Sequence, residues 1–169
     1  MGTRGWFKKY VEHTPCAKVR LVLEFFVVFA RFEYALKASG YFSESHTPDW
    51  CAFANKQENI TGFKQHVAEK RRLASALNRV LDNPPRIQRF VGENLTWERR
   101  SNAPCGDHDL GRAVVALKDM RNNLFHGSKN MLFPGHQGHR DIRLLKDGLT
   151  ILSALVDLDP KAKSAFLNG

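Results

Sequence analysis

The chain has 169 residues, 43% of them hydrophobic, so it can bury a core without a disulfide framework or a structural metal. Its 26 lysines and arginines exceed its 17 aspartates and glutamates, which gives a net charge of +9 and a pI near 9.7. This excess favours a polyanionic partner such as RNA, DNA or a membrane surface, although the same charge can serve solubility alone.

The cysteines and the apolar runs exclude several classes of protein. Cys16, Cys51 and Cys105 are too few and too widely spaced for a disulfide framework or a zinc site, so we expect reduced, buried thiols. The basic start lacks the apolar stretch of a secretory signal, and the most apolar run, residues 21–30, is too short to cross a bilayer. We therefore expect a cytoplasmic protein with no membrane partner.

The first predicted helix covers residues 15–36. Pro15 suits its first turn, and apolar residues fall on most of its faces, so we place this helix at the centre of the fold. A segment with Gly and Pro follows, and then a short helix over residues 49–57, capped by Thr47 with Pro48 at its first position.

Residues 61–81 form the next predicted helix, which is amphipathic and ends before two consecutive prolines. The hydrophobic periodicity is lost over residues 84–106, which predicts an irregular insertion, either a long connection or a short pair of strands. Asp107 or Asp109 suits the start of the following helix, because an acidic side chain stabilises the positive end of the helix dipole.

That helix is expected to run to about His126, and a loop rich in Gly and Pro follows over residues 128–138. The last main helix covers residues 141–158, with apolar side chains at spacings of three and four that suit a bundle or a partner chain. Pro160 ends it, and residues 161–167 add one more turn.

No long segment alternates with a period of two, so we predict an all-α fold. The expected architecture is an up-and-down helical bundle of four main helices plus short helices, in a single domain over residues 1–169. Glycine-rich phosphate loops are missing from the sequence, which excludes the common nucleotide-binding motifs.

The end of the helix near residue 121 carries the most informative pattern. Arg121 interrupts an apolar stripe, and a guanidinium on such a face requires a carboxylate or phosphate partner, because desolvating it alone is costly. Gly127 suits the position after a helix, so His126 would lie at the helix end with its ring able to turn toward Arg121. The stripe, at steps of four, three, four and three, comprises Leu110, Val114, Leu117, Arg121 and Leu124.

The segment from Arg121 to His126 resembles the R-x4-6-H motif of HEPN domains, the higher-eukaryote and prokaryote nucleotide-binding fold. Four residues separate the arginine from the histidine, the polar Asn122 follows the arginine, and the motif lies near the end of a predicted core helix. The first and last main helices also look like those of bacterial HEPN proteins. Residues 84–106 are not placed by the resemblance.

The resemblance implies a metal-independent endoribonuclease of the toxin–antitoxin or defence type, with no cofactor. Arg121 would contact the scissile phosphate, His126 would transfer protons, and Asn122 would orient either the histidine or the phosphate. Two motifs would meet at a composite cleft in a homodimer. The products would carry a 2′,3′-cyclic phosphate and a 5′-hydroxyl.

Further residues are assigned around this motif by their position in the sequence. Glu33 either forms an exposed pair with Lys37, the interpretation we favour, or points inward and holds Arg121. His136 and His139 lack the ligands that would complete a metal site, so no metal is expected. We expect contacts with the RNA backbone, with a solvated surface as the ordinary alternative, from Lys118, Lys129, Arg140 and Arg143.

Two other functions agree with the same sequence. The first is a noncatalytic module that binds RNA or a nucleotide through the cleft, with a cognate antitoxin or another regulatory protein as a partner. The second is a helical dimeric adaptor, in which the Arg121 motif only stabilises the fold or the dimer.

Overall fold

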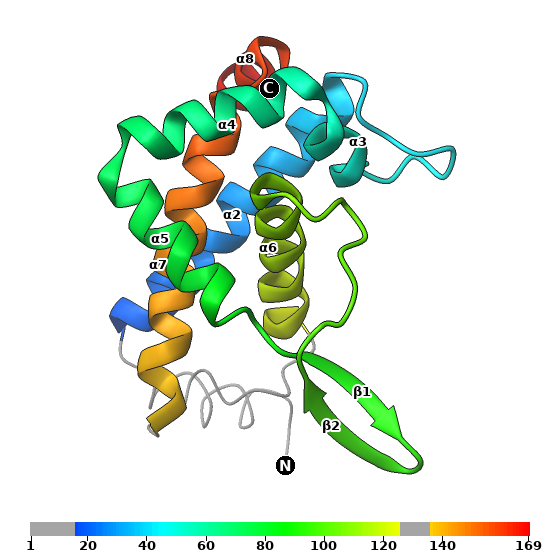
Figure 1. Cartoon of the computed structure of the whole chain (residues 1–169), viewed down its shortest axis with the longest axis vertical. Coiled ribbons are helices and arrows are strands. Elements are labelled where there is room, and N and C mark those ends of the chain that lie inside the picture. The colour runs from blue at the N-terminus through cyan, green and yellow to red at the C-terminus, as the bar shows by residue number, and fades with distance from the viewer. Residues whose placement is uncertain (1–15, 126–135) are drawn as a thin grey trace, which may run out of the picture.

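The computed structural model describes residues 16–125 and 136–169, and these two ranges are mainly helical (Figure 1). The expectation of a mainly helical fold is therefore confirmed, with the addition of one two-stranded antiparallel sheet. The elements in chain order are α2 (Cys16–Ala38), α3 (Trp50–Asn55), α4 (Gln57–Glu69), α5 (Arg71–Asp82), β1 (Ile87–Val91), β2 (Asn94–Glu98), α6 (Asp109–Phe125), α7 (His136–Val156) and α8 (Pro160–Asn168).

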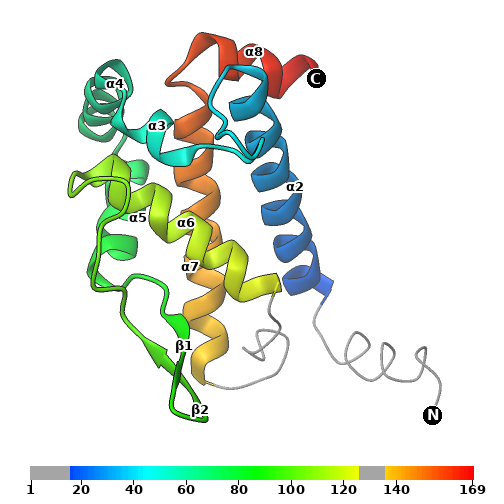
Figure 2. The same cartoon turned by 90° about the vertical axis from the view of Figure 1, so that its right-hand side faces the viewer.

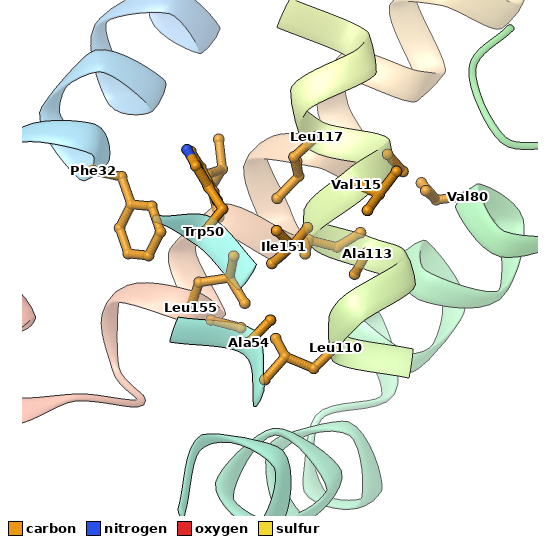
Figure 3. Close-up of a cluster of buried hydrophobic side chains, with 14 of the residues drawn as sticks. Phe32, Trp50, Ala54, Val80, Leu110, Ala113, Val115, Leu117, Ile151 and Leu155 are labelled. Atoms are coloured by element: carbon orange, nitrogen blue, oxygen red, sulfur yellow. The ribbon is translucent and has the colours of Figure 1, made fainter. Parts of the chain in front are cut away.

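The hydrophobic core lies between α2, α3, α5, α6 and α7 (Figure 3). Gly148 lets α7 approach its neighbours closely, since a Cβ there would lie 2.9 Å from both the Met120 sulfur and the Phe25 ring. Burying each large apolar side chain contributes roughly 1.5–3 kcal/mol. The largest fully buried side chains include Phe25, Phe32, Phe53, Phe63, Leu77, Leu110, Leu117, Ile151, Leu152 and Leu155.

The apolar residues on most faces of the first helix predicted a position at the centre of the fold. In the structure, however, one face of this helix is exposed. One face of α2 packs into the core, and α7 and α8 both contact the helix. On another face Leu23 and Val27 are 58% and 67% exposed. Figure 2 shows the reason, because α2 forms one edge of the molecule.

Two predicted helix boundaries are wrong. The cap of α3 is Asp49, which accepts a hydrogen bond of 2.8 Å from the Ala52 N–H, and the expected cap Thr47 lies two residues earlier. The single helix predicted over residues 61–81 is two helices, α4 and α5, which meet at an extended backbone at Lys70. The break allows α5 to pack on α6 and α7, an effect of tertiary contacts that local periodicity does not report.

Residues 84–106 contain the strand pair that was one of two predicted alternatives. β1 and β2 pair from Ile87 with Glu98 to Val91 with Asn94, so two residues form the turn. Gly92 occupies that turn with φ +63°, a conformation that favours glycine in tight hairpins.

The C-terminal region also differs from the expected boundaries. α7 begins at His136, so the last three residues of the predicted loop are helical, and residues 126–135 lie outside the described ranges. Pro160 starts α8, where Asp159 caps the helix by accepting hydrogen bonds from the backbone N–H groups of Lys161 and Ala162.

Asp159 also fixes α8 to the segment before α4. The Tyr41 hydroxyl donates to its carboxylate at 2.7 Å and the Lys56 ammonium lies at 3.2 Å. Burial raises the pKa of Asp159, but the hydrogen bonds from Tyr41, Ala162 and Lys56 outweigh burial and hold the pKa below its usual value.

Cys51 and Cys105 form a disulfide, so the expectation of reduced thiols is wrong for these two residues. Their Cα atoms lie 4.5 Å apart, and the bond joins α3 to the segment that precedes α6. The spacing in the sequence did not predict the pairing, because the fold brings together positions 54 residues apart. Disulfides persist mainly in oxidising compartments. The cytoplasmic location was expected because the thiols were expected to be reduced, so the disulfide removes that support.

No helix in the described ranges combines the length and the apolar character that crossing a bilayer requires.

Replacing Cys51 with Ser should lower the free energy of unfolding by about 2–4 kcal/mol, because a disulfide that closes a long loop restricts the unfolded chain. Urea unfolding with and without a reducing agent measures this change. Reduction should destabilise the wild type and the Cys16→Ser control but leave Cys51→Ser unaffected. Equal unfolding midpoints for wild type and Cys51→Ser without reductant would contradict the prediction.

Candidate functional site

Arg121 lies in the last turn of α6, where the apolar stripe of that helix reaches the surface. Leu110, Val114 and Leu117 are buried, as the periodicity predicts, whereas the Arg121 side chain is 34% exposed. Its Nη1 donates to Asn122 Oδ1 at 3.0 Å, and the guanidinium carbon lies 5.6 Å from the centre of the Phe29 ring. A cation at this distance from an aromatic ring is attracted to it.

Glu33 on α2 provides a carboxylate partner for Arg121. Its Oε2 lies 3.6 Å from Arg121 Nη2, and the Trp50 indole N–H donates to its Oε1 at 3.4 Å. The favoured pairing of Glu33 with Lys37 is therefore wrong, since no ion pair among the described residues joins those two. Phe29 and Glu33 lie one turn apart on the same side of α2, so both can face the end of α6.

These residues line a cleft of about 300 Å³ between α2, α3 and α6. Lys118 lies one turn before Arg121 and contributes a second cation, so two positive side chains face one carboxylate. Trp50 is 2% exposed and stacks on Phe29, which makes it part of the cleft wall. The lining residues are Phe29, Glu33, Thr47, Pro48, Trp50, Lys118, Arg121 and Asn122.

The structure brings together four of the residues predicted from the sequence: Lys118, Arg121, Asn122 and Glu33. His126 and Lys129 lie outside the described ranges. The Arg121 guanidinium and the Lys118 ammonium at this helix end can donate charge-assisted hydrogen bonds to a phosphate oxygen that approaches from the solvent side.

Arg140 and Arg143, which were expected to contact RNA beside the motif, line a different cavity from the one that contains Arg121. Arg140 donates to the backbone carbonyls of Asn83 at 3.3 Å and Pro84 at 3.0 Å, just beyond the end of α5. Both arginines line a cavity of about 550 Å³ between α5 and α7, together with Arg79. Arg140 therefore fixes the chain after α5, a role that its position near the motif in the sequence did not indicate.

An ion pair with a buried carboxylate lies beside the motif and was not predicted. Arg100 donates to both carboxylate oxygens of Asp119, with distances of 2.9 and 2.6 Å, and the Asp119 side chain is 5% exposed. This hydrogen bonding raises the pKa of the Arg100 guanidinium. Asp119 lies two residues before Arg121 in the sequence, but no local signal identifies a partner 19 residues earlier in an irregular stretch.

Asn123 stabilises the same helix end from its buried side. Its amide donates to the Arg86 carbonyl at 2.8 Å, which holds the chain entering β1 against α6. Across the described residues, no group of three His, Cys, Asp or Glu side chains is arranged to hold a metal ion.

Comparison with known proteins gives no relative: no protein-family profile matches the chain, and neither a curated protein nor a solved structure matches it significantly.

Arg121→Ala should cost only about 1 kcal/mol of folding stability, because partly exposed ion pairs contribute little. Arg100→Ala is the matched comparison. It should cost about 3 kcal/mol or more, since it leaves the buried Asp119 carboxylate without its partner. Chemical denaturation of both variants checks the order. A larger loss for Arg121→Ala would identify Arg121 as mainly a structural residue.

Proposed function

We propose that this chain is a HEPN-like helical bundle that cleaves RNA without a metal ion, using Arg121 and His126. The observation that supports the proposal best is the placement of Arg121. A permanently charged guanidinium is held by Glu33 and Phe29 at the rim of a solvent-facing cleft, with Lys118 beside it. A cation kept partly exposed at such a position is suited to a phosphate oxygen.

In the proposed reaction, the 2′-hydroxyl of the RNA attacks the adjacent phosphorus. The O2′–P bond forms, the P–O5′ bond breaks, and the products are a 2′,3′-cyclic phosphate and a 5′-hydroxyl. His126 takes the proton from the 2′-hydroxyl or gives a proton to the leaving O5′, a task suited to a side chain with a pKa near ~6.5. Arg121 stabilises the negative charge that develops on the phosphate oxygens.

Glu33 and Asn122 act on Arg121 in this proposal. Both contact its terminal nitrogens, so they restrict the side chain to an orientation along the cleft. Glu33 also keeps one carboxylate close to the incoming phosphate, and Lys118 offsets that charge. In the complete enzyme, two copies of this site act together across a homodimer, and an antitoxin or other regulatory protein controls it.

The ion pair itself supports a second candidate function, the helical adaptor. A carboxylate that satisfies Arg121 explains the interrupted stripe without any ligand, because the pair joins α6 to α2. In that case neither RNA binding nor cleavage depends on Arg121, and its replacement affects only stability.

Purified wild type should cut RNA in the presence of EDTA and leave cyclic-phosphate ends. His126→Ala should slow cleavage by about 100- to 10,000-fold, as expected for loss of a general acid or base. Arg121→Ala should slow it by about 100- to 1,000-fold, through lost charge stabilisation. Arg72→Ala, which removes an exposed arginine of α5, is the control for net charge and should cut normally.

The rates are measured with a labelled oligoribonucleotide at enzyme excess, and the ends are identified by mass spectrometry. RNA that stays intact with wild type, or equal cutting by wild type and His126→Ala, would contradict the proposed enzyme. Intact RNA that binds wild type but not Arg121→Ala would indicate the noncatalytic binding module instead.

A further inference from the structure

One face of α2 carries a row of exposed apolar side chains, here called the α2 stripe: Leu23, Val27, Ala30 and Tyr34. Leu23 is 58% exposed, Val27 67% and Tyr34 48%, and Ala30 is also exposed. Their steps of four, three and four residues place them in one line along the helix. The steps span about 16 Å at roughly 1.5 Å per residue.

The α2 stripe is more than scattered surface hydrophobicity. Single exposed apolar residues are ordinary, but a row at heptad spacing is the pattern of a helix that packs against another helix. None of the described elements covers the row, since α2 forms an edge of the molecule (Figure 2). α8 extends the apolar surface at the Tyr34 end, where Leu167 is 63% exposed.

We propose that the α2 stripe binds the α2 stripe of a second copy of this chain, with the two helices antiparallel. This inference extends the proposed function, which needs two copies, by naming the surface that joins them. A two-fold axis between Val27 and Ala30 sets Leu23 opposite Tyr34 of the partner subunit. The same axis sets Val27 opposite Ala30 of the partner subunit. No side chain of the stripe therefore faces its own copy, and the small Ala30 side chain packs against the larger Val27.

The charges beside the stripe favour the antiparallel arrangement. Glu24 and Arg31 lie seven residues apart on one flank of α2, and Arg31 is fixed there because its Nε donates to the Phe166 carbonyl at 2.7 Å. In an antiparallel pair this flank faces the same flank of the other copy, so Glu24 comes close to Arg31 of the partner subunit. The two-fold axis creates the contact twice. In a parallel pair this flank would instead face the other flank of the partner's helix, so Glu24 and Arg31 of the partner subunit would lie on opposite sides of the interface and would not meet.

The arrangement also determines where the two Arg121 clefts lie. Glu33, which holds Arg121, is on the other flank of the α2 stripe. In an antiparallel pair the Glu33 flank of one helix lies beside the Glu33 flank of the other, so both clefts open on the same side of the dimer. The two Glu33 positions are nine residues apart along the paired helices, about 14 Å. One RNA strand can then contact both clefts.

Val27→Glu tests the interface in the full chain without RNA, so its result is independent of cleavage. Sedimentation equilibrium should show a wild-type dimer, and Val27→Glu should raise the dissociation constant by about 100-fold or more, since it buries an unpaired charge. Phe90→Glu, a matched change at a β1 residue that is 74% exposed, should leave the constant unchanged. Circular dichroism confirms that both variants are folded.

A charge exchange tests the orientation. Glu24→Lys should weaken the dimer, and Arg31→Glu should weaken it too, while the double variant should recover most of the affinity lost by Arg31→Glu alone. Wild type that is monomeric at about 100 μM, a range that detects even weak dimers, would overturn the inference. An unchanged dimer in Val27→Glu would overturn it as well. A double variant no tighter than Arg31→Glu would overturn the antiparallel arrangement.

Discussion

The ion pair between Arg121 and Glu33 joins the end of α6 to α2, and the candidate site depends on it. The apolar stripe of α6 packs into the core, and the last turn of the helix leaves the core at the point where Arg121 interrupts that stripe. Glu33 and the Phe29 ring hold the guanidinium at that point, while Trp50 links Glu33 to α3. Three elements therefore determine where one cation faces solvent.

Two further bonds hold the elements around this ion pair. The Cys51–Cys105 disulfide ties α3 to the segment before α6, and Cys51 directly follows Trp50. Arg100 and Asp119 fix the same segment to the opposite side of α6. The cleft is thus built on elements that are bonded to one another, as a site must be if it is to hold a phosphate in one orientation.

Sequence patterns predicted the features that depend on local periodicity and missed those that depend on distant contacts. The extent of α6, its buried stripe and the anomaly at Arg121 follow from spacing alone. The break at Lys70, the disulfide and the Arg100–Asp119 pair involve tertiary partners, which a single sequence does not reveal. Glu33 is an example. Its spacing in the sequence suggested an ion pair with Lys37, but the packing of α2 against α6 places it beside Arg121 instead.

The central claim is that Arg121 binds phosphate in competition with Glu33. Fluorescence anisotropy with a 2′-O-methyl oligoribonucleotide, which cannot be cleaved by 2′-hydroxyl attack, measures this binding alone. Glu33→Gln should bind more tightly than wild type, because it removes a negative charge beside the phosphate, and Arg121→Ala should bind about 10-fold more weakly, the loss of one charged hydrogen bond. Equal affinity for all three proteins would contradict the account.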